Sequence, residues 1–122
     1  MNKSDYLSRY AEGWNKGDAS IIAESTDDSF QLDDPNAGSI SKNGIPDYLA
    51  GLKQEAQGIR SEATDVFMEL TEVVTQEEGD VLTAWCWWSI SGTPIQGSGL
   101  IKVGDGGVIS ERLTYYTKLP VS

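Results

Sequence analysis

The sequence contains no histidine and a single cysteine, Cys86. Without histidine, a Ser-His-Asp triad, a His-Asp dyad and a histidine-ligated metal site are all excluded. One cysteine cannot form a disulfide within the chain, which suits a reducing cytoplasm. We therefore expect a cytoplasmic protein without a metal site or an organic cofactor, in which Cys86 is a buried structural thiol.

Basic residues are also scarce, since 9 Lys and Arg stand against 19 Asp and Glu and give a net charge of −10. No basic stripe is present to neutralise phosphates, so we expect no nucleic-acid partner. An anionic membrane surface would repel the chain, and no apolar run approaches the roughly 20 residues of a membrane span. Residues 1–5 lack the apolar stretch of a signal peptide. The 122 residues fit one domain, 1–122.

Helical spacing of apolar residues dominates the first half of the sequence. It predicts a helix between a capping residue at Ser4 and a stop at Gly17. A short second helix is expected over 18–23, where Asp18 is its cap. A third is expected over 45–57, after a loop rich in Gly, Ser and Asn at 35–43.

Strand-like segments make up most of the rest of the chain. They are expected at 30–34, 63–75, 81–91, 95–103 and 108–118. Helices gather early and hairpin-linked strands gather late, which is typical of an α+β domain. We expect a curved antiparallel sheet with helices packed on one face.

Asp34 ends the first of these strands and precedes Pro35. Because strand side chains alternate between faces, Phe30, Leu32 and Asp34 are expected on one face, which is mostly apolar and therefore buried. A carboxylate in such a place is costly to desolvate unless it is paired or used. Asp34 is therefore a candidate catalytic residue. The alternative is a structural role in which its side chain closes the turn.

Three local motifs, in this order and spacing, resemble the NTF2-like superfamily in its SnoaL-like and ketosteroid-isomerase-like branch. They are Arg9-Tyr10 with Gly17-Asp18, Asp34-Pro35, and residues 104–109 followed by Tyr115-Tyr116. The resemblance covers essentially the whole chain. It implies a cone-shaped, cystatin-like fold in which a strongly bent sheet wraps around the long N-terminal helix. Two further helices complete the fold around a deep apolar pocket.

The resemblance also assigns roles to particular residues. Asp34 falls where the ketosteroid isomerases have their general base, and Tyr10 falls where they have the tyrosine of the oxyanion hole. Gly99 falls where they have a protonated aspartic acid, and glycine has no side-chain donor. This departure speaks against steroid isomerisation by that mechanism. From the residues alone, Tyr10 on an amphipathic helix is also compatible with a plain core role.

On the last strand, the resemblance places Arg112, Thr114 and Tyr116 on the pocket face. Arg112 would then pair with Asp34 or with an anionic ligand. An error of one residue in the strand register would instead put Arg112 on the surface. The other positions expected on the pocket wall are Trp14, Leu32, Leu52, Trp88 and Gly99.

Two classes of function remain. One is a cofactor-independent isomerase, polyketide-cyclase-like cyclase or lyase that moves a proton next to a carbonyl, with Asp34 as acid and base and Tyr10 as donor. The other is a non-catalytic domain that binds a small apolar or carboxylate-bearing molecule, or another protein. Trp85 and Trp87 share one strand face and Trp88 the other, so both faces are apolar. The resemblance implies a homodimer through the outer sheet face, with Trp85 and Trp87 at the interface.

Overall fold

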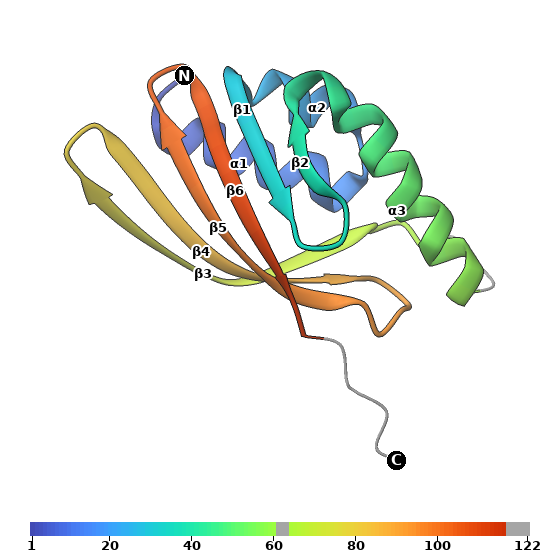
Figure 1. The fold of residues 1–122 in the computed structure, drawn as a ribbon. Coiled ribbons are helices and arrows are strands. Elements are labelled where there is room, and N and C mark those ends of the chain that lie inside the picture. The colour runs from blue at the N-terminus through green and yellow to red at the C-terminus, as the bar shows by residue number, and fades with distance from the viewer. Residues whose placement is uncertain (61–63, 117–122) are drawn as a thin grey trace.

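The computed structural model describes residues 1–60 and 64–116, and it confirms an α+β architecture (Figure 1). Helices gather early in the chain and strands follow, as the sequence predicts. The elements are α1 Lys3–Lys16, α2 Ala19–Glu24, β1 Thr26–Asp34, β2 Gly38–Ser41, the 3-10 helix η1 Lys42–Gly44, α3 Ile45–Ile59, β3 Met68–Glu78, β4 Val81–Ile90, β5 Gln96–Gly104 and β6 Gly107–Tyr115.

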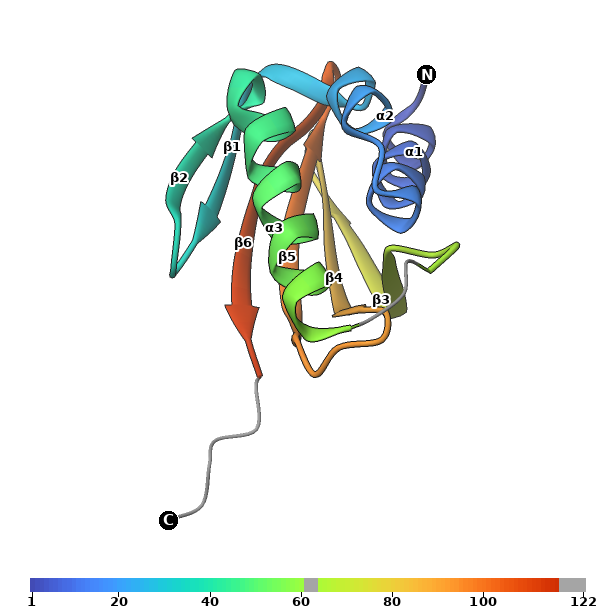
Figure 2. The same ribbon diagram turned by 90° about the vertical axis from the view of Figure 1, so that its right-hand side faces the viewer.

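Six strands form one sheet in the order β2-β1-β6-β5-β4-β3. Neighbouring strands are antiparallel except β1 and β6, which run parallel. The sheet is thus mixed, because the hairpins linking β3 to β6 leave the last strand running in the same direction as β1. The helices lie on the concave side of the curved sheet, with α3 crossing in front of it in Figure 2.

Several elements differ in extent from the prediction. β2 and part of η1 lie in the expected loop at 35–43, where β2 pairs with the end of β1. β1 starts earlier than expected, at Thr26, and α3 runs on to Ile59. The predicted start of the third strand at residue 63 and the end of the last at residue 118 lie outside the described residues.

The ends of α1 follow from local hydrogen bonds. Its N-cap is Asn2 rather than the expected Ser4, because Asn2 and Asp5 exchange hydrogen bonds in a capping box. The Asp5 backbone N–H donates to Asn2 Oδ1 at 2.8 Å. The helix ends as predicted at Gly17, whose φ of 66° lies in the left-handed region that glycine adopts without strain.

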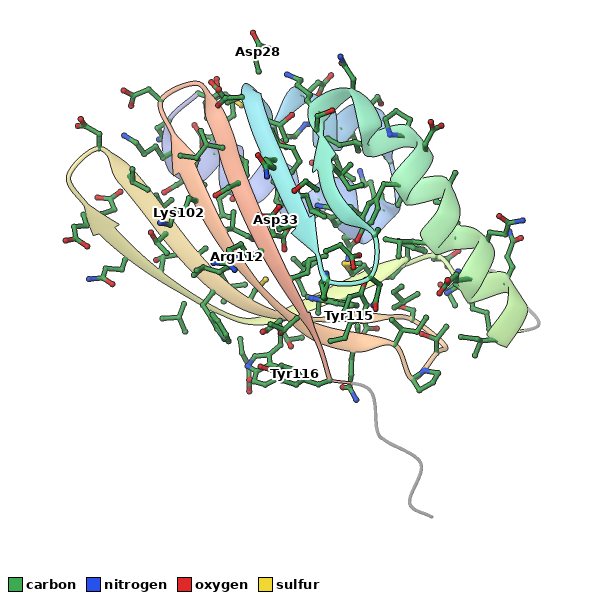
Figure 3. The ribbon with its side chains drawn as sticks, viewed as in Figure 1. Asp28, Asp33, Lys102, Arg112, Tyr115 and Tyr116 are labelled. Carbon is green, nitrogen blue, oxygen red and sulfur yellow. The ribbon has the colours of Figure 1, made fainter. Side chains whose placement is uncertain are left out.

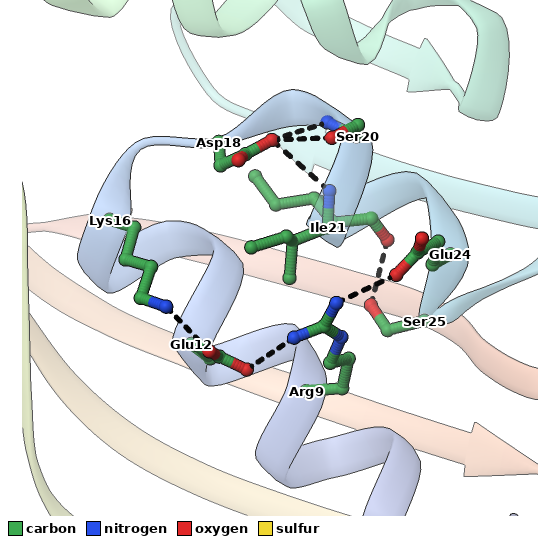
Figure 4. A network of polar contacts seen from close by, with 9 residues as sticks. Arg9, Glu12, Lys16, Asp18, Ser20, Ile21, Glu24 and Ser25 are labelled. Atoms are coloured by element: carbon green, nitrogen blue, oxygen red, sulfur yellow. Dashed lines mark hydrogen bonds and ion pairs between the residues drawn. The ribbon is translucent and has the colours of Figure 1, made fainter.

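Polar contacts connect α1 to α2 (Figure 4). Asp18 caps α2 by accepting a hydrogen bond from the Ser20 backbone N–H at 3.0 Å. Arg9 donates to Glu12 at 2.7 Å and to Glu24 at 2.9 Å. These contacts link the two helices at their junction.

A β-bulge in β6 decides which of its side chains face the helices. Val108 pairs with Val103 and Ser110 with Lys102, so Ile109 has no partner across the β5–β6 ladder. The extra residue moves the later side chains of the strand to the opposite faces. The buried and half-buried side chains after the bulge are Glu111, Leu113 and Tyr115, and the exposed ones are Arg112, Thr114 and Tyr116.

Within the described residues, no helix has the length and apolar character needed to cross a membrane.

Candidate functional site

A small cavity lies between the helices and the concave face of the sheet, and it encloses about 20 Å³. This is room for one group the size of a water molecule. Four positions predicted on the pocket wall do line it, namely Trp14, Leu32, Leu52 and Trp88. The other lining residues are Tyr48, Met68, Leu70, Cys86, Glu111, Leu113 and Tyr115.

Glu111 is the carboxyl group of this cavity, and its residue is only 5% exposed. The Tyr10 hydroxyl donates a hydrogen bond to Glu111 Oε1. Burial disfavours the charged carboxylate and raises the pKa of Glu111 to about 7, although the Tyr10 hydrogen bond acts in the opposite direction. Glu111 therefore exchanges a proton close to neutral pH, which is the property that a general acid or base needs.

The structure also explains Gly99. A Cβ placed on Gly99 would collide with Oε2 of Glu111, so the absent side chain leaves the space that this carboxyl group fills. A carboxyl group from the neighbouring strand β6 thus occupies the space beside Gly99. Sequence reasoning missed Glu111 because the resemblance assigned the other face of β6, that of Arg112, to the pocket. The available signal was Gly99 itself, which leaves room on β5 for a side chain of the neighbouring strand.

Asp34 is buried on the predicted face, with only 4% of its surface exposed. It accepts hydrogen bonds from the hydroxyl groups of Tyr48 at 2.5 Å and Tyr115 at 2.6 Å. Two backbone N–H groups of the following turn, those of Asn36 and Ala37, donate to it at 2.7 and 3.2 Å. The carboxylate therefore closes the turn, which was the structural alternative, and also anchors two tyrosines.

These four donors decide the proton affinity of Asp34. Burial raises its pKa, but the hydrogen bonds from Tyr115, Tyr48 and the turn outweigh burial and hold the pKa below its ordinary value. A carboxylate with a lowered pKa is a weak base. Asp34 and Tyr10 also have different partners, because the Tyr10 hydroxyl is bonded to Glu111. The expected pairing of Asp34 with Tyr10 at one site is therefore not what the structure shows.

The expectation that Arg112, Thr114 and Tyr116 face the pocket is wrong. All three are exposed on the outer face of the sheet, since the bulge changes the alternation of β6. Figure 3 shows Arg112 beside Lys102 and Asp33, away from the helices. Arg112 therefore does not pair with Asp34, and a carboxylate ligand in the cavity has no anchor there.

A wider groove of about 540 Å³ opens beside the cavity, between α3 and the β1–β2 turn. Tyr48, Leu52 and Tyr115 line both hollows and so lie between them. The ionisable side chains along the groove, tyrosines aside, are the acids Asp34, Asp47 and Glu55. In the described part of the chain, no Lys or Arg lines either hollow. The groove is thus lined by aromatic and acidic side chains.

The tryptophans of β4 lie on both faces of the sheet, as the alternation of strand side chains requires. Trp88 and Cys86 face the cavity, while Trp85 and Trp87 are 39% and 40% exposed on the outer face. Burial raises the pKa of Cys86 to about 12, so its thiol stays protonated and unreactive. Trp87 lies against Tyr116, with ring centroids 5.1 Å apart. The homodimer through this face stays a prediction.

Across residues 1–60 and 64–116, no three His, Cys, Asp or Glu side chains gather as a metal-binding group.

No protein-family model and no curated protein sequence matches the chain. Solved structures do match it. An NTF2-like protein of unknown function from Cytophaga hutchinsonii superposes with a TM-score of 0.62 over 95% of this chain and 91% of that one, at 15% identity. The chain has the NTF2-like fold. A proposed polyketide cyclase from Xanthomonas campestris pv. campestris shares this fold at a TM-score of 0.63, with 14% identity over 93% of this chain and 89% of that one. A proposed ketosteroid isomerase from Kribbella flavida also shares this fold, at a TM-score of 0.56. The two are 16% identical, and the match covers 97% of this chain and 80% of that one.

The NTF2-like fold predicted from the sequence, with its bent sheet and three helices, is thereby confirmed. At such low identity the likeness concerns the fold, and chemistry has to be argued from the site itself.

The anchoring role of Asp34 leads to a prediction about stability. Asparagine at this position keeps an oxygen for the backbone N–H groups, but its amide nitrogen cannot accept from a tyrosine hydroxyl. We expect Asp34→Asn to lower the free energy of unfolding by about 1–3 kcal/mol, because a buried hydroxyl loses its acceptor. Urea unfolding of wild type and variant at pH 7 measures the difference. Equal midpoints would show that the two tyrosine hydrogen bonds contribute nothing.

Proposed function

We propose that this protein is a cofactor-independent pocket enzyme that moves a proton next to the carbonyl group of a small molecule. The observation that carries the proposal is Glu111, a buried carboxyl with a pKa of about 7 on the wall of an apolar cavity. A general base is most effective when its pKa lies close to the working pH. Glu111 meets that condition and Asp34, with its lowered pKa, does not.

The chemistry follows from the two protonation states of Glu111. The carboxylate takes a proton from the carbon next to the carbonyl, and the electron pair of the broken C–H bond moves onto the carbonyl oxygen to form an enolate. The protonated Glu111 then returns the proton to the same carbon or, in a conjugated ligand, to a more distant one. Tyr10 holds one oxygen of Glu111, so its role is to orient the acid. Oε2 of Glu111, above Gly99, is the oxygen left to take the proton.

The names of the structural neighbours support the same reaction class. A proposed polyketide cyclase and a proposed ketosteroid isomerase share the fold. Isomerisation, cyclisation and elimination beside a carbonyl all begin with removal of an α-proton. We therefore place the protein in the isomerase, cyclase or lyase class, with a cytoplasmic location also proposed.

Hydrogen–deuterium exchange tests this proposal without knowledge of the natural ligand. The probe is 1-indanone, whose carbon 2 carries exchangeable α-protons. In D₂O we expect the wild type to accelerate their loss above the buffer background, as measured by proton NMR. The catalysed rate should rise with pH as Glu111 loses its proton and level off above about pH 7.

The opposite results separate the competing functions. If 1-indanone binds but its exchange rate equals the buffer background, the enzyme proposal is wrong and the protein is a non-catalytic ligand-binding domain. Absence of both binding and exchange would favour the protein-interaction alternative.

A further inference from the structure

A second hollow, of about 340 Å³, lies in the outer face of the sheet, and we call it the outer hollow. It occurs where β1 and β6 lose their pairing. Residues 27–30 of β1 stand opposite Ile109 alone, and the β5–β6 ladder also leaves Ile109 without a partner. Such irregularities in a ladder bend the strand, and they are found often beside functional sites. The outer hollow is thus a built feature of the sheet.

Two basic side chains line the outer hollow, Lys102 on β5 and Arg112 on β6. Lys102 pairs with Ser110 and Arg112 pairs with Leu100, so the two cations are diagonal neighbours on one face of the sheet. Diagonal neighbours have Cβ atoms about 7 Å apart, which lets two long side chains contact one small ligand between them. Figure 3 shows both together with Asp33 on the outer side of the sheet.

Lys102 and Arg112 have no hydrogen bond or ion pair with any other described residue. Every other Lys and Arg of the described chain donates to an acid or to a backbone carbonyl, namely Lys3, Arg9, Lys16, Lys42, Lys53 and Arg60. The chain as a whole has a net charge of −10. Two adjacent cations without a partner repel one another, and an anion between them relieves that repulsion.

Asp33 also lines the outer hollow, but other groups bind its carboxylate. Its Oδ1 atom accepts hydrogen bonds from the Ser39 hydroxyl at 2.7 Å and from the Gln31 amide at 3.1 Å. The guanidinium of Arg112 therefore keeps its donors for a ligand. Two positive charges and one negative charge line the outer hollow, which leaves one net positive charge. This charge suits a monovalent carboxylate better than a phosphate dianion.

The outer hollow also offers apolar surface. Leu100 and Ile109 line it, and both are half-buried. Trp85 is the partner of Leu100 across the β4–β5 ladder and is 39% exposed on the same face. Apolar side chains beside a pair of cations favour a ligand whose carboxylate is attached to an apolar body, because burial of that body adds to the attraction between charges.

We propose that the outer hollow binds a small carboxylic acid with an apolar or aromatic body. The carboxylate lies between Lys102 and Arg112, and the body contacts Leu100 and Ile109. The guanidinium donates two parallel hydrogen bonds to the carboxylate, and the ammonium supplies a second positive charge. This site lies on the other face of the sheet from the cavity that contains Glu111, so it goes beyond the proposed function and does not depend on it.

NMR titration of ¹⁵N-labelled protein tests the site, at pH 7 and at low ionic strength because salt screens exposed charges. The probes are benzoate, acetate, benzyl alcohol and inorganic phosphate. We expect benzoate to shift the Arg112 side-chain N–H and the Leu100 backbone N–H until they saturate. Acetate lacks the aromatic body, benzyl alcohol lacks the charge, and phosphate has a less suitable charge. All three should therefore bind more weakly.

Variants show which charges bind the ligand. Arg112→Gln is expected to weaken benzoate binding about 3- to 10-fold, since it removes the hydrogen bonds of the guanidinium to a carboxylate. Lys102→Gln should weaken it about 2- to 5-fold, the usual effect of one exposed charge. Lys16→Gln on α1 is the matched control. It changes the net charge of the chain by the same amount and should leave the affinity unchanged.

Asp33→Asn makes the opposite change. The asparagine oxygen still accepts from the Ser39 hydroxyl, but the negative charge of the outer hollow is removed. We expect benzoate to bind about 2- to 5-fold more tightly, and phosphate to gain more because it carries more charge. An unchanged affinity for both anions would show that neither binds beside Asp33, which would contradict the proposal.

The proposal is overturned if benzoate shifts no resonance of the outer hollow, if benzyl alcohol or phosphate binds as tightly, or if Lys16→Gln weakens benzoate as much as Arg112→Gln does. Shifts confined to the cavity, such as that of the Trp88 indole, would also overturn it. Light scattering tests the predicted homodimer, since a dimer that binds no benzoate would assign both cations to the interface between copies. None of these results involves α-proton exchange, so they are distinct from failure of the enzyme proposal.

Discussion

Glu111→Gln is expected to slow the catalysed exchange of the α-protons of 1-indanone by about 10²- to 10⁴-fold, the usual contribution of a general acid or base. Glutamine has almost the shape of glutamic acid, and its amide oxygen still accepts the hydrogen bond that the Tyr10 hydroxyl now donates to Glu111. What it lacks is an oxygen that takes and releases a proton. The cavity is therefore preserved while the chemistry is lost. Initial exchange rates in D₂O at pH 7, measured by proton NMR, give the ratio.

Asp34→Asn is the matched control for this experiment, because it neutralises the other buried carboxyl that sequence reasoning favoured. Asp34 orients Tyr48 and Tyr115 but has a lowered pKa. We expect the variant to keep the exchange rate within about tenfold of the wild type, since loss of orientation costs less than loss of the base. If Asp34→Asn abolished exchange and Glu111→Gln did not, Asp34 would be the base after all.

Tyr10→Phe separates orientation from proton transfer. The variant removes the only side-chain donor to Glu111 within the described residues. The pKa of Glu111 should then rise further, because the Tyr10 hydrogen bond is what lowers it against burial. The pH at which exchange levels off should move upward with it. An unchanged pH profile would mean that the group titrating in the rate is not Glu111.

The contrast between Asp34 and Glu111 shows what could be predicted from the sequence. Alternation along an ordinary strand correctly placed Phe30, Leu32 and Asp34 on the buried face, because β1 keeps its alternation from Phe30 to Asp34. On β6 the same rule correctly separated Arg112, Thr114 and Tyr116 from Glu111, Leu113 and Tyr115, but the resemblance assigned the wrong one of these two groups to the pocket. Alternation does not say which face of a strand is buried, and the bulge at Ile109 keeps the buried Val108 from indicating it.

Contacts between segments far apart in the sequence also could not be predicted. The parallel pairing of β1 with β6 joins the β1–β2 hairpin to the four strands β3 to β6, and no local pattern specifies it. The hydrogen bond between Tyr10 and Glu111 spans almost the whole chain. The cluster of Asp34 with Tyr48 and Tyr115 depends on α3, β1 and β6 meeting at one place. Residue types marked the candidates, but their partners came only from the packing of the elements.

Glu111 is also expected to make the wild type lose stability as the pH rises. Its pKa is about 7 in the folded state against an ordinary value of 4.5, so the folded state binds a proton more tightly than the unfolded state. The associated stabilisation is complete below about pH 4.5 and is lost as the pH passes 7. The loss amounts to about 3 kcal/mol, because each pKa unit corresponds to about 1.4 kcal/mol.

The comparison that isolates this effect is between wild type and Glu111→Gln. Both contain the same other titrating groups, and their difference in free energy of unfolding therefore reports Glu111 alone. Between pH 4.5 and 8, urea unfolding should show Glu111→Gln gaining about 3 kcal/mol relative to the wild type. A constant offset across this range would mean that the carboxyl is ionised at no cost and has an ordinary pKa. The base proposed for the reaction would then not exist.

Asp34→Asn supplies the control of opposite sign. The pKa of Asp34 is lowered in the folded state, so its contribution to stability is present above the ordinary value of 3.8 and is lost as the pH falls below it. The difference between wild type and Asp34→Asn should thus change in the acid range and stay flat between pH 5 and 8, where Glu111 titrates. Two buried carboxyls with opposite pH dependence would show that the fold keeps one charged as an anchor and the other close to neutral as a proton carrier. Glu111 would then destabilise the protein at the pH at which the proposed reaction needs it, which is expected of a residue kept for chemistry, since an uncharged side chain of the same shape would stabilise the fold better.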